Sequence, residues 1–157
     1  GGLLVNGAPV HGAMHPEIGH IRIRRAPGDA FDGACPFHGD CIEGLVSGPA
    51  LAARFGAPAQ DAPDNHPVWD YVAADIAELA GIILLTTSAQ RLLIGGGVAM
   101  SRPFVLPAVR DIVVERLSSY LPFLTSQTAQ RIIRAPGLGA DAGPLGAVAL
   151  ALAALAD

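Results

Sequence analysis

The chain has 157 residues, which suits one domain or one lobe of a two-lobed protein. Hydrophobic residues make up 51% of it and charged residues 15%, a composition that excludes an intrinsically disordered chain. The ten basic and fourteen acidic residues give a formal net charge of −4, which argues against a nucleic-acid-binding surface.

All ten basic residues are arginines, and the sequence contains no lysine. This excludes a Walker-type phosphate loop, a Schiff-base lysine and a lysine general base. Any binding of phosphate must therefore use backbone N–H groups, arginine or a metal ion.

The first forty residues predict short strands followed by a long loop. Residues Gly2–Val5 and Ala8–His11 flank Asn6-Gly7, a strong β-hairpin signal. The alternating segment His20–Arg24 predicts a half-buried strand. Residues 25–40 are rich in glycine, proline and aspartate. An irregular loop of that length is uncommon in a domain unless a cross-link holds it in place.

The rest of the chain alternates predicted helices and strands. The expected elements are a helix at Cys41–Phe55 ending at Gly56, a long helix at Asn65–Gln90, a strand at Arg91–Ile94, a helix at Pro107–Leu121, a strand at Arg131–Arg134 and a final helix at Gly143–Leu155. This order predicts an α/β fold in which helices cover a mixed sheet.

The two ends of the chain bear on membrane association, on the cellular compartment and on whether the chain is a fragment. The apolar run Ala147–Ala156 is half the length of a membrane span (about 20 residues), so we predict a buried helix and no membrane partner. With no visible signal peptide, we expect a cytoplasmic protein. The chain opens on Gly1-Gly2 and an apolar segment rather than on methionine, so we expect a fragment.

The segment Cys35-Pro-Phe-His38-Gly-Asp-Cys41 is the strongest chemical signal. Two thiolates and an imidazole at this compact spacing are typical of a zinc knuckle, because Zn²⁺ prefers sulfur and nitrogen ligands. The alternative is a pair of ordinary buried cysteines beside a surface histidine. We favour metal, because its binding would order a loop that has too little apolar content to order itself.

A fourth ligand would close the site. His20 is our choice, with His11 and His15 as nearby rivals. Four protein ligands leave no position for an activated water, so the predicted metal has a structural role and metal-assisted hydrolysis is not expected.

Polar groups next to this site could bind a polyhydroxylated ligand. If one ring nitrogen of His20 holds the metal, the other can donate a hydrogen bond, and Glu17 and Glu43 are acceptors at short sequence distance. The alternative is that both glutamates are ordinary exposed carboxylates. Farther along, Gly95-Gly96-Gly97 either lets a ligand approach the backbone or forms a tight turn.

Together these segments resemble the ROK family (repressor, open reading frame, kinase), and within it the bacterial fructokinases. The resemblance rests on His15–His20, on the knuckle with its continuation to Pro49, on Leu93–Val98 and on Gly143–Ala147. It implies an actin-like, ribonuclease-H-like fold and an ATP-dependent sugar kinase that uses Mg·ATP. Residues 1–157 would be the C-terminal lobe, with the zinc-binding loop at 25–42 and the N-terminal lobe absent.

The resemblance also assigns roles to residues. It implies that Glu17, His20 and Glu43 contact the sugar, and that His20, Cys35, His38 and Cys41 hold Zn²⁺. Nucleotide contacts would come from Gly95, Gly96 and Gly97, with Gly1 and Gly2 as the end of a phosphate-binding loop.

The resemblance places the catalytic aspartate in the N-terminal lobe, so we expect no catalytic residue in this chain and no activity of the chain alone. The parent would phosphorylate a hexose, with fructose favoured, and would form a homodimer. Two alternatives remain, a sugar-responsive repressor of the same family and a zinc-stabilised interaction module without ligand chemistry.

Overall fold

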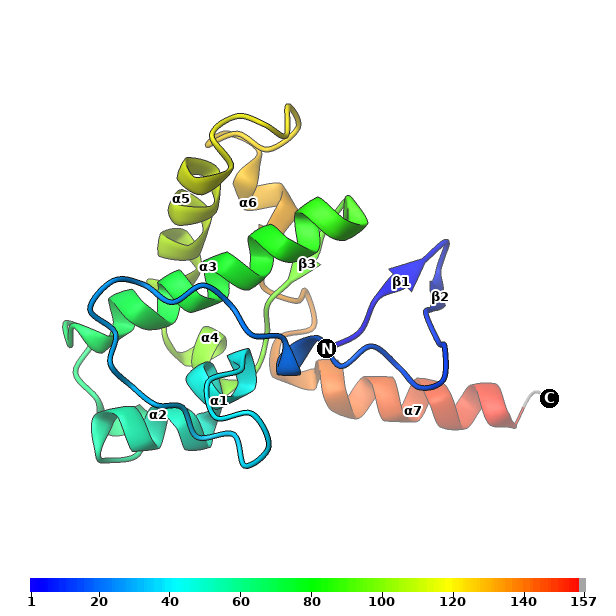
Figure 1. The fold of residues 1–157 in the computed structure, drawn as a ribbon. Coiled ribbons are helices and arrows are strands. Elements are labelled where there is room, and N and C mark those ends of the chain that lie inside the picture. The colour runs from blue at the N-terminus through cyan, green and yellow to red at the C-terminus, as the bar shows by residue number, and fades with distance from the viewer. Residues whose placement is uncertain (156–157) are drawn as a thin grey trace. The chain divides into compact units, whose positions relative to one another are not determined.

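The computed structural model describes residues 1–155, which form two compact units (Figure 1). The first unit is Gly1–Ile82 and the second begins at Ile83. Helix α3, Val68–Thr87, begins in the first unit and ends in the second. The long helix predicted at 65–90 is therefore confirmed, a few residues shorter at each end.

The predicted N-terminal hairpin is confirmed. Strand β1, Leu4–Val5, pairs antiparallel with β2, Ala8–Pro9. Asn6 and Gly7 join them with φ angles of 53° and 81°. A two-residue turn with both angles positive matches the twist of the flanking strands, and asparagine and glycine are the residues that adopt it most readily.

The strand predicted at His20–Arg24 is wrong. The chain instead forms a 3-10 turn, η1, at Ile18–His20, followed by a single bridge between Arg22 and Cys41. Ile42 donates its N–H to the carbonyl of Ile21 at 3.0 Å, but helix α1 begins at Ile42, so the partner backbone turns away. The alternating apolar and polar residues predicted extended backbone at this position, but such a pattern gives no information on whether a partner strand lies beside it.

The helix predicted at Cys41–Phe55 divides into α1, Ile42–Val46, and α2, Gly48–Phe55. Ser47 lies between them with extended backbone, and its hydroxyl accepts a hydrogen bond from the N–H of Ala50 at 3.3 Å. This is an N-cap that starts a new helix, and Pro49 in the first turn favours the same start. Helix α2 ends, as predicted, at Gly56.

The core of the first unit forms where α1, α2 and the start of α3 pack together. Leu45, Leu51 and Val72 are fully buried there. Trp69 is also buried, and its indole N–H donates to the carbonyl of Pro63 at 2.9 Å, just after the 3-10 turn η2, Ala59–Asp61. This core is the support against which the preceding loop folds.

The second unit contains the remaining elements. They are β3, Leu92–Leu93; α4, Gly97–Ser101; α5, Val105–Leu117; α6, Ala129–Ile132; β4, Ile133–Arg134; η3, Gly139–Asp141; and α7, Ala142–Ala154. Helix α5 buries Val109 and Val113, and Arg110 donates to the carbonyl of Ile133 at 2.7 Å. The strand predicted at 91–94 and the helices predicted at 107–121 and 143–155 are present. Of the strand predicted at Arg131–Arg134 only Ile133–Arg134 is extended, because Arg131 and Ile132 belong to α6.

The predicted single mixed sheet is not formed within residues 1–155. The described strands make two separate pairs, β1 with β2 antiparallel and β3 with β4 parallel. Each strand is two residues long, so each presents too little edge to recruit a third. The fold class is α/β, as predicted.

Helix α7 is present, but its predicted burial is wrong. Large apolar side chains along it are exposed, among them Leu145, Val148, Leu150 and Leu152, with Leu150 at 74%. The element that packs most on α7 is the short turn η3 just before it. So short a turn cannot cover a helix of 13 residues that is apolar on all sides. The end of the predicted run, Ala156, lies outside the described residues.

Among residues 1–155, no helix combines the length and the hydropathy that crossing a bilayer requires.

Candidate functional site

The knuckle predicted at Cys35–Cys41 is a tight backbone loop. Cys35 and Gly39 exchange two backbone hydrogen bonds, of 3.1 and 2.9 Å. Ala34 donates to the carbonyl of Gly44 at 2.8 Å and so fastens the loop to α1. Cys35 and Cys41 are buried on the inner side, whereas Phe37 at the tip is exposed. The local fold therefore turns both sulfurs inward.

His20, Cys35, His38 and Cys41 come together as predicted. Their ligand atoms all lie within 4.8 Å of one another. The Nδ1 atom of His20 is 3.8 Å from Cys35 Sγ and 3.7 Å from Cys41 Sγ, and Nδ1 of His38 is 3.8 Å from Cys35 Sγ.

These distances fit a tetrahedral metal site. With Zn–S bonds of about 2.3 Å and Zn–N bonds of about 2.0–2.1 Å, ligand sulfur and nitrogen atoms at a tetrahedral angle are separated by about 3.6 Å. The observed S–N separations of 3.7 and 3.8 Å are close to this edge. The donor set suits Zn²⁺ in chemistry as well as in size.

The thiols of Cys35 and Cys41 ionise as a coupled pair. Burial acts to raise the pKa of Cys35, but hydrogen bonds from the N–H groups of Phe37 and His38, with smaller contributions from Cys41 and His38, lower that pKa to about 6. Burial raises the pKa of Cys41, and the neighbouring Cys35 raises it further. The pair as a unit therefore supplies a thiolate more readily than two isolated thiols, and the thiolate is the form that binds metal.

The second nitrogen of His20 points away from the sulfurs. Its Nε2 lies 3.8 Å from Oε2 of Glu43, whose side chain is 52% exposed, while that of His20 is 27% exposed. A metal on Nδ1 leaves Nε2 with the proton, so this edge presents one N–H donor beside one carboxylate acceptor. Such a pair can bind a hydroxyl that donates to Glu43 and accepts from His20.

Glu17, predicted as a ligand contact, forms an ion pair with a neighbouring histidine. Its Oε1 lies 2.7 Å from Nε2 of His15, and both side chains are largely exposed. Among the described residues, His15 and His11 are not part of the Cys/His cluster, so His20 is the histidine that joins the knuckle. Glu17 directly precedes η1 as its N-cap residue, three positions before His20.

Gly44 is a residue that sequence analysis passed over. A Cβ atom at this position would overlap the carbonyl oxygen of Gly39 and lie 2.8 Å from the N atom of Cys35. The knuckle thus packs directly on the backbone of α1. The available signal was an isolated glycine inside a helical pattern, which often marks a close backbone approach.

A buried ion-pair network is the second feature that sequence analysis missed. The Arg54 guanidinium lies 3.1 Å from Asp29 and 2.7 Å from Asp75, and these three side chains are 2%, 3% and 0% exposed. Arg54 also donates to the carbonyl of Leu45 at 3.0 Å and stacks over the Phe31 ring at 4.7 Å. Asp29 is held a second time by Arg25.

This network attaches the first part of the predicted loop to the helical core. Burial acts to raise the pKa of Asp29, but hydrogen bonds from Arg25 and Arg54 outweigh it and hold that pKa below its ordinary value. Residues 25–31 are therefore fastened by charge-assisted hydrogen bonds and not by the cysteines. No local sequence pattern connects residue 29 to residues 54 and 75.

The glycines assigned to the nucleotide lie in two places. Gly1 and Gly2 are exposed at the start of the first unit, where the Cβ position of Gly1 is 4.0 Å from Ile18. Gly95, Gly96 and Gly97 form an exposed turn between β3 and α4 in the second unit. Open space surrounds the Cβ positions of Gly96 and Gly97, so this turn is accessible to a ligand.

Comparison with known proteins decides the family. The chain matches the ROK family over residues 1–154. It belongs to the ROK family. A protein of Bacillus subtilis (strain 168) is 40% identical to it over 156 residues, covering 98% of this chain and 52% of that protein. A fructokinase of Zymomonas mobilis subsp. mobilis is 39% identical over 157 residues, covering 98% of this chain and 51% of its own length.

Solved structures support the fold. The ROK hexokinase of Thermus thermophilus superposes with a TM-score of 0.64 at 23% identity, over 93% of this chain and 51% of that chain. This likeness places the chain in the actin-like α/β fold of ROK sugar kinases. The chain spans about half the length of the relatives it matches.

Proposed function

We propose that the protein to which this chain belongs is an ATP-dependent hexose kinase, with fructose as substrate and fructose 6-phosphate as product, and that residues 1–157 are its C-terminal lobe. ROK-family membership and similarity to proteins named fructokinase support the reaction class. The observation that carries the proposal is the His20–Glu43 pair held beside the Cys/His cluster.

In this proposal Zn²⁺ is a structural ion held by His20, Cys35, His38 and Cys41. The bound ion would supply a fixed anchor that orients the His20 ring. His20 then presents Nε2–H at a constant position, and Glu43 faces it from the first turn of α1. Glu17, which directly precedes the 3-10 turn that carries His20, is our third sugar contact.

Phosphoryl transfer also requires groups that the sugar contacts do not provide. The sugar hydroxyl oxygen forms a bond to the γ-phosphorus of Mg·ATP, the bond to the bridging β–γ oxygen breaks, and the hydroxyl proton passes to a general base. In the proposal the base lies outside residues 1–157, while Gly1, Gly2 and the Gly95–Gly97 turn contribute nucleotide contacts. We therefore expect residues 1–157 alone to be inactive. We also propose that the complete kinase is a cytoplasmic homodimer.

The test uses the full-length protein and its Glu43→Gln variant. We expect ATP-dependent phosphorylation of fructose in preference to glucose and mannose. In the variant the KM for fructose should rise about tenfold, because a neutral amide replaces the charged acceptor of a sugar hydroxyl. Glu115→Gln, on the exposed side of α5, is the matched control and should leave the KM unchanged.

Three results separate the proposal from its rivals. Fructose binding without phosphorylation would favour a sugar-responsive repressor. No binding of any hexose would favour a structural zinc module. Equal KM values for Glu43→Gln and the parent protein would remove Glu43 from the sugar site while leaving the reaction class intact.

A further inference from the structure

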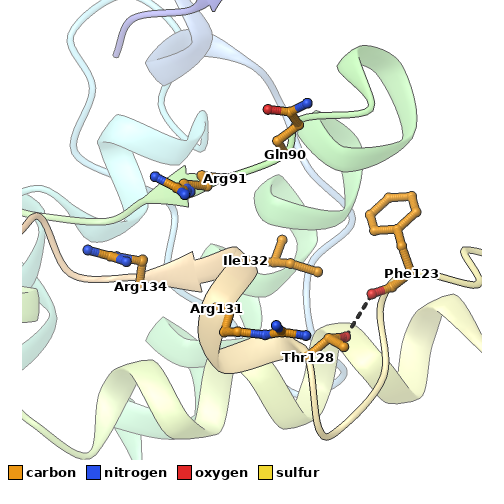
Figure 2. A pocket seen from close by; sticks show the side chains of 7 residues that line it. All are labelled: Gln90, Arg91, Phe123, Thr128, Arg131, Ile132 and Arg134. Carbon is orange, nitrogen blue, oxygen red and sulfur yellow. Dashed lines mark hydrogen bonds between the residues drawn. The ribbon is translucent and has the colours of Figure 1, made fainter.

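A positively charged pocket lies in the second unit, formed by residues just before β3, by the segment before β4 and by Arg134 of β4. Its volume is about 320 Å³. The lining residues are Gln90, Arg91, Phe123, Thr128, Arg131, Ile132 and Arg134 (Figure 2). None of them belongs to the Cys/His cluster or to the glycine turns described above.

Most of the pocket lining lies at the amino-terminal end of β3, away from the Gly95–Gly97 turn, whereas Arg134 is the last residue of β4 and its carbonyl accepts a hydrogen bond from Ile94. Gln90 and Arg91 precede β3, whereas the glycines follow it. Because β3 and β4 run parallel, Arg131 and Ile132, which precede β4, come to the same amino-terminal end. A ligand held by Gln90, Arg91 and Arg131 would therefore lie at the other end of β3 from the glycine turn.

Two of the arginines share one face of the strand pair. Leu93 is the register partner of Arg134, and Arg91 precedes Leu93 by two residues, so all three point to the same side. That side is exposed, while Ile133 on the other side is fully buried. Figure 2 shows Arg91 and Arg134 on one side of Ile132, and Arg131 extending the other way, toward Thr128.

The charge of this pocket is unbalanced. Within residues 1–155, none of Arg91, Arg131 and Arg134 forms an ion pair with a carboxylate, whereas arginines of the first unit such as Arg25 and Arg54 do. Three guanidinium groups around one hollow repel each other, and an anion between them removes that repulsion. Guanidinium groups also match the oxygen geometry of phosphate.

The remaining lining gives the pocket a defined wall. The Thr128 hydroxyl donates to the carbonyl of Phe123 at 2.7 Å and closes the loop between them (Figure 2). This bond holds the backbone at Phe123, and Ile132 lies between the arginines as an apolar part of the lining. The pocket thus combines cations at both ends with an apolar middle.

We propose that this pocket binds a small polyanion of the phosphorylated class, with its anionic groups held on either side of Ile132 by Arg91 and Arg134 at one end and Arg131 at the other. The proposal does not depend on the kinase function, since it uses none of the residues assigned to sugar or nucleotide.

The test is calorimetric titration of the full-length protein with pyrophosphate and with inorganic phosphate, without added magnesium. We expect pyrophosphate to bind at least about tenfold more tightly, because it carries a higher negative charge and offers the three arginines two phosphoryl groups instead of one. The affinity should fall as salt is raised, as for any site built on exposed charges. Equal affinity for the two anions would overturn the proposed two-ended site.

Variants locate the binding. Arg131→Met and Arg134→Met keep the length and apolar stem of the side chain, and each should weaken pyrophosphate binding about tenfold. Arg24→Met removes one exposed arginine from the first unit and should leave the affinity unchanged. A triple variant carries Arg91→Met, Arg131→Met and Arg134→Met together. If pyrophosphate still binds to it, the binding belongs to the nucleotide site and the proposal is refuted. Thermal unfolding of each variant confirms that the fold is retained.

Discussion

The long irregular loop of the first unit consists of two regions that are held in different ways. Residues 25–31 are attached to the helical core by the buried cluster of Arg54, Asp29 and Asp75. Residues 33–42 form the knuckle, whose inward-facing groups are two thiols and a histidine. The first region carries its own counter-charges, whereas the second gathers ligands that need an ion. A metal is therefore expected to order only the second region.

The largest effect should come from Arg54→Met. The substitution leaves two buried carboxylates without the cation they share, so we expect a loss of about 3–5 kcal/mol in the free energy of unfolding. Denaturant unfolding of the full-length protein measures it. Arg24→Met is the control, because the Arg24 side chain is 78% exposed and lies 3.8 Å from Glu78, and it should change stability by less than about 1 kcal/mol. A similar small change for Arg54→Met would show that the cluster does not stabilise the loop.

Removal of the metal ligands should affect the other region. In Cys41→Ser we expect loss of stoichiometric zinc and faster amide exchange in residues 33–42, because the loop has little apolar surface to hold it. Residues 25–31 should keep their protection. Hydrogen–deuterium exchange with mass spectrometry separates the two regions. Uniform loosening of 25–42 would mean that the metal orders the whole loop, as composition alone suggested.

Gly44→Ala tests the close approach between knuckle and helix. The added methyl group overlaps the carbonyl of Gly39, so we expect a loss of about 1–3 kcal/mol together with weaker zinc binding. Gly81→Ala provides the matched control, because open space surrounds its Cβ position in α3. That substitution should be neutral or stabilise by up to about 1 kcal/mol. Metal analysis and thermal unfolding give both readouts.

The smallest effect is a pH dependence of the ion-pair region. The pKa of Asp29 is lower in the folded protein than its ordinary value of 3.8. Its stabilising contribution is therefore present above pH 3.8 and is lost as the pH falls below that value toward the folded pKa. Unfolding curves should show a steeper loss of stability below pH 3.8 for the parent protein than for Asp29→Asn. Parallel curves would contradict the lowered pKa.

The local elements were largely predictable. Asn6-Gly7 predicted its hairpin, Gly56 predicted the end of α2, and the apolar spacing predicted α3. These succeeded because each depends on backbone preferences or on a period carried by neighbouring residues. The strand at His20–Arg24 failed because pairing needs a partner that local sequence does not contain.

The Cys/His cluster was predictable for a related reason. Cys35, His38 and Cys41 lie within seven positions of one another, so a single tight loop is enough to bring their side chains close together. The choice of His20 over His15 needed the backbone path through η1. The pairing of Glu43 with His20, and of Glu17 with His15, also depends on where that turn points the side chains.

By itself the sequence determined the hairpin, the longer helices, the metal-ligand spacing and the family, because each depends on residues close along the chain or on a pattern shared with relatives. Only the tertiary structure decided that Arg54 joins Asp29 to Asp75, that Gly44 must lack a side chain, and that three arginines surround one pocket. These features join residues that are distant in sequence, and their energies arise from burial and charge proximity that exist only after the chain has packed.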